Sequence, residues 1–291
     1  MLTALDHVIL AVHDLDAARD RYQGLLGLAP SWTGEHPEAG TANVLFRVDN
    51  TYLELLAPAG DGPARGLLEA WLALRGEGLL GLAFATDDAE ACRTALETRG
   101  LAPGPVEDGH GRDTISGAQR RWRRLMLPMD HTRGVLLFPI EHTSPAEALP
   151  RAIATGEPGA SVHALDHAVV QSGDAEATKA LYGEGLGLRL ALDKEFPDWG
   201  MRLMFFRTGG VTVEVAASLG QSKDTSPTED RLWGLSWRVG DVDAARARIA
   251  AAGFDVSEVR TGRRPGTRVF TVRDGTCGVA TLMLEVSPGH R

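Results

Sequence analysis

Two histidine–glutamate pairs with the same spacing are the residues of this sequence best suited to chemistry. Glu54 follows His7 by 47 residues, and Glu214 follows His167 by the same 47 residues. A histidine and a carboxylate that meet in a fold can hold a divalent metal ion or exchange protons with a substrate. Because the spacing recurs in two distant parts of the chain, we interpret the pairs as equivalent positions of a repeated unit.

Four glutamates lie in or directly after apolar, strand-like runs. They are Glu54, Glu141, Glu214 and Glu285. Such a carboxylate either faces solvent on a half-exposed strand or faces inward, where it needs a metal or a charged partner. For a single glutamate the surface position is the simpler interpretation. Four glutamates at equivalent positions of a repeat favour a polar interior site.

The elements that must position these pairs repeat across the chain. The run LDHVIL at residues 5–10 returns as LDHAVV at residues 165–170, an offset of 160 residues without a gap. In the first copy, hydrophobic periodicity predicts a strand over 6–12 and a helix that begins after Asp14 and ends at Gly27. Three strands are predicted to follow, at residues 29–33, 43–48 and 52–56.

The sequence therefore predicts an α+β protein made of four strand–helix–strand–strand–strand (βαβββ) units, arranged as a duplicated pair. The second and fourth units open near Gly81 and Gly234, and their helices are predicted at residues 88–98 and 242–252. Residues 144–163 contain several prolines and glycines, and we expect them to link an N-terminal domain (1–143) to a C-terminal domain (164–291).

The repeated unit, with Leu-Asp-His opening its first and third copies, resembles the vicinal oxygen chelate superfamily of glyoxalases, bleomycin-resistance proteins, epimerases and extradiol dioxygenases. His36-Pro37 and the runs at 40–43 and 52–56 are further similar to a glyoxalase-like subgroup. The resemblance implies that the four units pair into two curled, open barrels of eight strands. It also implies a divalent metal ion inside, held by residues on the first and last strands of the units.

The resemblance implies one set of metal-binding positions in each half. They are His7, Glu54, Gly81 and Glu141 in the N-terminal half, and His167, Glu214, Gly234 and Glu285 in the C-terminal half. The glycines stand where many members have a second histidine, so each set offers one histidine and two glutamates. This set suits Fe, Mn, Ni, Zn or Mg without selecting among them. We expect the C-terminal set to be the better site, because Pro139 disturbs the strand before Glu141.

These residues predict a metal-dependent lyase or isomerase of the glyoxalase type, whose small substrate chelates the ion through two vicinal oxygens. The ion would stabilise an oxyanion, and Glu214 or Glu285 would act as the catalytic base. A ring-cleaving dioxygenase is an alternative, although such members of the superfamily use two histidines and one glutamate. A metal-free protein that binds small molecules or confers drug resistance is the other alternative.

Arginines and aromatic residues supply candidates for substrate binding. Four arginines flank Trp122, and a second group in the fourth unit includes Arg264 and Arg268. Together with Trp237 they could hold a carboxylate or phosphate, although a charged strand edge and a core tryptophan are the simpler interpretations. The resemblance adds His36 as a substrate contact.

The bulk composition narrows the class of protein. A length of 291 residues suggests about two domains, and the net charge of −9 argues against a nucleic-acid partner. Two cysteines and the lack of a visible signal peptide favour a reducing cytoplasm. No apolar run reaches the ~18 residues of a membrane span. We therefore expect a cytoplasmic protein with a small-molecule partner, and the sequence leaves its oligomeric state open, a homodimer included.

Overall fold

The computed structural model describes residues 1–220 and 229–287. The N-terminal half contains β1 (Leu2–Ala11), α1 (Leu15–Leu26), β2 (Leu28–Ala29), β3 (Trp32–His36), β4 (Thr41–Arg47), β5 (Tyr52–Pro58), α2 (Pro63–Arg75), β6 (Gly78–Thr86), α3 (Ala89–Thr98), β7 (Glu107–Asp113), β8 (Gln119–Arg124) and β9 (Leu136–His142). The C-terminal half contains β10 (Ile153–Ala154), β11 (Val162–Ser172), α4 (Ala175–Ala180), β12 (Arg189–Phe196), β13 (Met201–Thr208), β14 (Val211–Ser218), β15 (Arg231–Val239), α5 (Val242–Ala251), β16 (Arg260–Thr261), β17 (Thr267–Val272) and β18 (Ala280–Val286).

The first helix of each unit begins in the same way. An aspartate side chain accepts a hydrogen bond from a backbone N–H in the first turn of α1, α3, α4 and α5, which satisfies a donor that the helix itself cannot pair. The four aspartates are Asp14, Asp88, Asp174 and Asp241. The repeat of this cap confirms the predicted division into four units.

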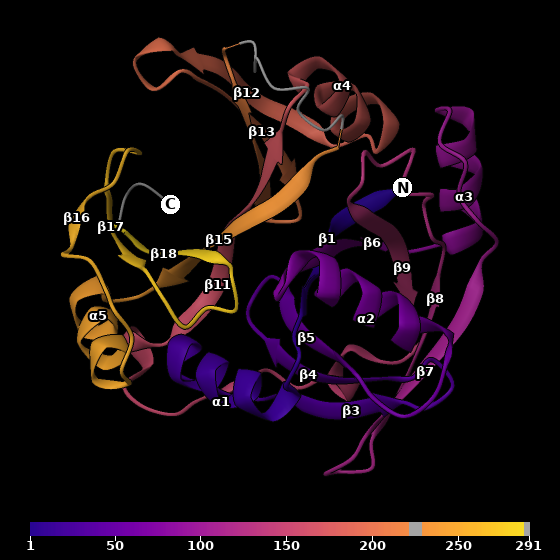
Figure 1. The fold of residues 1–291 in the computed structure, drawn as a ribbon, viewed down its shortest axis with the longest axis horizontal. Coiled ribbons are helices and arrows are strands. Elements are labelled where there is room, and N and C mark those ends of the chain that lie inside the picture. Colours follow the sequence, from indigo (N-terminus) through magenta and orange to yellow (C-terminus); the bar gives the residue numbers. More distant parts are fainter. Residues whose placement is uncertain (221–228, 288–291) are drawn as a thin grey trace.

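Each half forms an eight-stranded curled sheet, as predicted, but the two sheets end differently (Figure 1). The N-terminal sheet has the order β1-β5-β4-β3-β7-β8-β9-β6 and closes into a barrel. Its seam is short: Gly34 pairs with Asp113 and Glu35 with Arg112. The C-terminal sheet has the order β12-β13-β14-β11-β15-β18-β17-β16 and stays open between β12 and β16.

The strand that closes the N-terminal barrel, β7, is not predicted by the sequence pattern. Its residues, EDGHGRD, are polar and include two glycines, so they lack the apolar alternation that marks a strand. Tertiary pairing with β3 and β8 makes this segment a strand.

The inside of the N-terminal barrel is packed, and one end is covered. Ile9, Phe138 and neighbouring side chains form a cluster separate from the main core. Helix α2 closes the end where β1 finishes, because Leu68 and Leu72 pack against Ala11. Among the described residues, no helix is both long and apolar enough to cross a lipid bilayer.

Candidate functional site

In the N-terminal barrel the structure brings His7 and Glu54 together. Strands β1 and β5 are parallel neighbours in which Ile9 pairs with Glu54, so His7 and Glu54 project from the same face. His7 Nε2 lies 3.4 Å from Glu54 Oε2, and His7 Nδ1 donates to Asp6 Oδ1 at 2.7 Å. A second donor reaches Glu54, because Asn43 Nδ2 donates to Oε1 at 2.7 Å.

These contacts favour the charged forms of both members of the pair. Burial lowers the pKa of His7, but hydrogen bonds to Asp6 and Glu54 outweigh it and raise the value to about 9. Burial raises the pKa of Glu54, but the hydrogen bond and charge of His7 outweigh it and lower the value to about 2. At neutral pH the two side chains form a buried ion pair.

Aromatic rings surround this ion pair. Tyr52 stacks on His7 with ring centroids 4.5 Å apart, and Phe138 meets His7 edge-on at 5.8 Å. His36, predicted as a substrate contact, lies edge-on to Trp122 at 6.0 Å, with Nδ1 3.1 Å from the Thr41 hydroxyl oxygen. Burial lowers the pKa of His36. Only 4% of the His7 side chain is exposed to solvent.

In the C-terminal sheet the structure brings His167 and Glu214 together in the same way. His167 Nε2 lies 3.4 Å from Glu214 Oε2, and His167 Nδ1 donates to Asp166 Oδ2 at 2.9 Å. Here burial dominates and raises the pKa of Glu214, an effect that the charges of His167 and Arg263 only partly offset. The side chain of His167 is 18% exposed.

Arginines gather around the C-terminal pair. Arg238 Nε donates to Asp166 Oδ1 at 2.7 Å, and Arg264 Nη1 lies 3.9 Å from the same oxygen. Arg263 reaches from the β16–β17 connection to Trp199, which follows β12, and its guanidinium lies 3.7 Å from the indole centroid. This cation–π contact joins the two unpaired ends of the open sheet.

Glu141 and Glu285 do not join these pairs. Glu141 Oε2 accepts from the N–H of Ala89, the first residue of α3, and Glu285 Oε2 accepts from the N–H of Val242, the first residue of α5. Both carboxylates therefore occupy helix N-termini on the convex face, where the helix dipole favours a negative charge. Arg268 Nη1 lies 3.8 Å from Glu285 Oε2.

Strand register explains this placement. His7 pairs with Tyr52, and Glu54 lies two residues after Tyr52. Gly81, at the position of His7, pairs with Leu136, so the position equivalent to Glu54 is Phe138, two residues after Leu136. By the same count in the C-terminal sheet, where Gly234 pairs with Ala280, it is Leu282. The two glutamates lie three residues further along their strands, and an odd step turns a side chain to the opposite face. Trp237, a predicted substrate contact, is buried in the main core.

The residues fit a metal ion only in part. A separation of 3.4 Å between a ring nitrogen and a carboxylate oxygen suits two donors at about 2 Å from one ion, and an aspartate on the other ring nitrogen is typical of metal-bound histidines. Gly81 and Gly234 give no donor, and an added Cβ would meet a backbone oxygen at 2.7 and 2.6 Å. Within residues 1–220 and 229–287, no three His, Cys, Asp or Glu side chains are arranged to hold a metal.

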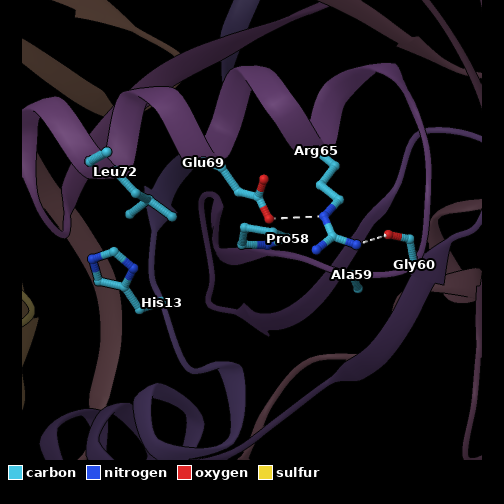
Figure 2. Close-up of a pocket in the computed structure, with 8 residues that line it drawn as sticks. His13, Pro58, Ala59, Gly60, Arg65, Glu69 and Leu72 are labelled. Atoms are coloured by element: carbon cyan, nitrogen blue, oxygen red, sulfur yellow. Dashed lines mark hydrogen bonds and ion pairs between the residues drawn. The ribbon is translucent and has the colours of Figure 1, made fainter.

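Two cavities lie outside these pairs. One, of about 490 Å³, lies between α2 and the end of β5; Figure 2 shows Glu69 accepting from Arg65, which also donates to Gly60. The other, of about 450 Å³, lies at the barrel end opposite α2 and is lined by Asp6 and Arg120 among others.

The aspartates that hold the two histidines were not predicted from the sequence. Asp6 and Asp166 each precede a histidine in the repeated Leu-Asp-His run, so the repeat itself carried the signal. The contact of Asn43 with Glu54 was not predicted either, and Asn43 has no counterpart in the C-terminal half, where Leu203 stands at the same offset.

Comparison with known proteins relates both halves to one superfamily. Residues 5–162 match the model of the glyoxalase-like domain, and residues 166–271 match that of the glyoxalase/bleomycin resistance protein/dioxygenase superfamily. The ethylmalonyl-CoA/methylmalonyl-CoA epimerase of Cereibacter sphaeroides is 32% identical over 120 residues, which are 40% of this chain and 87% of that protein. The mitochondrial methylmalonyl-CoA epimerase of Homo sapiens is 41% identical over 69 residues, which are 23% of this chain and 39% of that protein.

A solved structure shares the fold over the whole chain. A mutant of 4-hydroxymandelate synthase from Streptomyces coelicolor is similar over 99% of this chain and 95% of its own, with a TM-score of 0.70 and 16% sequence identity. At this identity the likeness concerns the fold alone.

Proposed function

Because this chain belongs to the glyoxalase-like domain family, we propose that it is an isomerase or lyase whose active site is the concave face of the C-terminal sheet. The observation that carries the proposal is the pair His167 and Glu214, which meet at 3.4 Å on a sheet that stays open. Burial raises the pKa of Glu214, and a carboxylate with a raised pKa is a stronger base near neutral pH.

The proposed reaction begins with proton removal from a carbon next to a carbonyl group. Glu214 takes the proton, the C–H electron pair passes into the carbonyl group, and an enolate forms. Asp166 fixes the His167 ring through Nδ1, so that Nε2 faces Glu214. The charge of Arg263 acts on Glu214, and the same charge would stabilise the developing oxyanion. Protonation of the enolate on its other face by solvent, followed by loss of the Glu214 proton to solvent, completes an isomerisation.

A divalent ion would be held by His167 and Glu214, and Glu214 would leave the ion when it acts as the base. When bound, it would act as a Lewis acid on the substrate's two vicinal oxygens. Gly234 and Leu282 bring no donors, so water and the substrate would complete the shell. Its identity stays open among Fe, Mn, Ni, Zn and Mg.

The relatives suggest the class of substrate. The epimerase of Cereibacter sphaeroides is named for ethylmalonyl-CoA and methylmalonyl-CoA, and this chain covers 87% of that protein. We therefore propose a substituted malonyl thioester, in which the acidic carbon lies between a carboxylate and a thioester carbonyl. Such a substrate offers two oxygens to an ion and a negative charge to the arginines.

A metal-free binding protein is the second candidate. The observation that favours it is that two of the four expected ligand positions in each half carry no side chain able to bind a metal. These positions are Gly81 and Phe138 in the N-terminal half and Gly234 and Leu282 in the C-terminal half. Such a protein would use the same concave face but would not exchange protons with its ligand.

The test is proton exchange at the acidic carbon of 2-methylmalonyl-CoA in deuterated water, followed by NMR. We expect exchange with the wild-type protein and a loss of at least ~100-fold in Glu214→Gln. Glu54→Gln is the matched control, because it makes the same change in the other half, and it should keep the activity. Binding without exchange by the wild-type protein would support the binding candidate, and loss in Glu54→Gln alone would place the reaction in the N-terminal barrel.

A further inference from the structure

Arg120 is a buried charge without a carboxylate partner. It lies on β8, on the inner face that Trp122 also occupies, and only 7% of its surface is exposed. Among the described residues, no acidic oxygen lies within ion-pair distance of its guanidinium. Burying an unpaired charge is costly, so a fold that keeps one usually provides a partner for it.

Two aromatic rings hold the guanidinium in place. Its central carbon lies 5.6 Å from the centroid of Trp32 and 5.3 Å from that of Tyr52. One N–H group of Arg120 contacts the Tyr52 hydroxyl, and the remaining N–H groups at the edge of the guanidinium suit bidentate contact with an oxyanion. Tyr52 also stacks on His7, so the arginine is one ring away from the N-terminal pair.

The guanidinium lines the cavity of about 450 Å³ at the end of the barrel opposite α2. The acids of this cavity are already paired: Asp6 with His7 and His142, and Asp49 with Arg151. Its second arginine, Arg47, donates to the backbone carbonyls of Ala146 and Leu149.

The cavity therefore carries two arginine charges that the described carboxylates do not balance. The other cavity differs in this respect, because its Arg65 is paired with Glu69. The lining also includes the apolar side chains of Leu5, Ala85 and Leu149, which could cover a short hydrocarbon part of a ligand.

We propose that this cavity is a binding site for a small oxyanion, a carboxylate or a phosphate, with Arg120 as its bidentate anchor. The site lies in the half that does not hold the proposed active site. Its occupation does not depend on the reaction proposed for the C-terminal sheet. Because the folded barrel forms the site, a bound anion would stabilise the barrel against unfolding.

The experiment measures thermal unfolding and calorimetric binding with malonate, acetate and inorganic phosphate, against chloride at the same ionic strength. Arg120→Gln removes the charge with little loss of volume, and Arg121→Gln makes the same change on the exposed, outward-facing neighbour. We expect wild type and Arg121→Gln to bind at least one oxyanion, and Arg120→Gln to bind it at least ~10-fold more weakly. Comparison of malonate and acetate with phosphate shows whether the site prefers a carboxylate or a phosphate.

A crossover in stability separates binding from a structural role. In chloride Arg120→Gln should be as stable as wild type or more so, because it removes an unpaired buried charge. In the preferred oxyanion wild type should become the more stable of the two. Equal destabilisation of Arg120→Gln in every buffer, or no response of wild type to any oxyanion beyond chloride, would overturn the proposal.

Discussion

His7 Nε2 lies 3.4 Å from Glu54 in the N-terminal barrel, and His167 Nε2 lies 3.4 Å from Glu214 in the C-terminal sheet. The same pair has opposite electrostatics in the two places. The pKa of Glu54 is lowered to about 2, whereas that of Glu214 is raised. The difference teaches that the surroundings of a pair, rather than its geometry, decide whether a carboxylate is locked into an ion pair or free to act as a base.

Substitutions at equivalent positions account for much of this difference. Asn43, which donates to Glu54, is replaced by Leu203 at the same offset in the C-terminal half. Tyr52, which stacks on His7, is replaced by Thr212. Glu214 therefore lacks the amide donor, and His167 lacks the stacked ring.

The way each sheet ends adds to the contrast. The N-terminal barrel closes through backbone pairing of β3 with β7 and is covered by α2. The ends of the C-terminal sheet are joined by the contact of Arg263 with Trp199. A side-chain contact opens more easily than a strand pair, so we expect the C-terminal face to admit ligands.

The largest expected effect is on stability. His7→Ala leaves Glu54 buried without its cation and should lower the free energy of unfolding by about 3–5 kcal/mol. His167 lies on a more open face, so His167→Ala should lower the free energy of unfolding by only about 1–2 kcal/mol. Urea unfolding followed by circular dichroism measures both, and equal losses would contradict the comparison.

The second prediction concerns pH. The pKa of His7 is raised from 6.5 to about 9, so folding favours its protonated form. This stabilisation is complete below pH 6.5 and is lost as the pH rises through about 9, a change of about 3 kcal/mol. The difference in unfolding free energy between wild type and His7→Gln should shrink over this range. A difference that stays constant would show that His7 is neutral in the fold.

The third prediction concerns metal binding. Mn²⁺ should bind at the C-terminal pair, and more tightly when malonate supplies two further oxygens. Calorimetry should show at least ~10-fold weaker binding in Glu214→Gln and no change in Glu54→Gln. Binding that disappears only in Glu54→Gln would reverse the assignment of the two halves.

The smallest expected effect concerns the ends of the open sheet. Trp199→Leu removes a cation–π contact of about 0.5–1 kcal/mol, which corresponds to a few-fold change in local opening. Hydrogen exchange should quicken in β12 and β16, while β3 and β7 keep their protection. Unchanged exchange in β12 would show that the contact does not hold the sheet.

The sequence predicted the fold because its signals are local and repeated. The helix start at Asp14 and the shared offset of the first and third units needed no tertiary information. The same repeat predicted which histidine and glutamate meet on neighbouring strands.

Register and long-range contacts could not be predicted in this way. Glu141 and Glu285 are equivalent, as predicted, because each accepts a hydrogen bond from the N-terminus of a helix. They lie on the convex face of the sheet, however, and not on the concave face that was predicted. When two units are aligned with a gap of a few residues, the alignment does not show whether a residue is shifted by an odd number of positions along its strand. Such a shift turns the side chain to the opposite face. Arg120 resembled the other three arginines that flank Trp122 until the fold placed it in contact with two aromatic rings.

The measurement that tests the central claim most directly is a carboxyl titration by carbon-13 NMR of protein labelled at the glutamate side chains. Glu54→Gln and Glu214→Gln assign the two resonances. The account predicts that Glu54 titrates near 2, below its usual value of 4.5, and that Glu214 titrates above that value. If both glutamates titrated below 4.5, the C-terminal carboxylate would be as firmly ion-paired as the N-terminal one, and the division of roles between the two halves would be wrong.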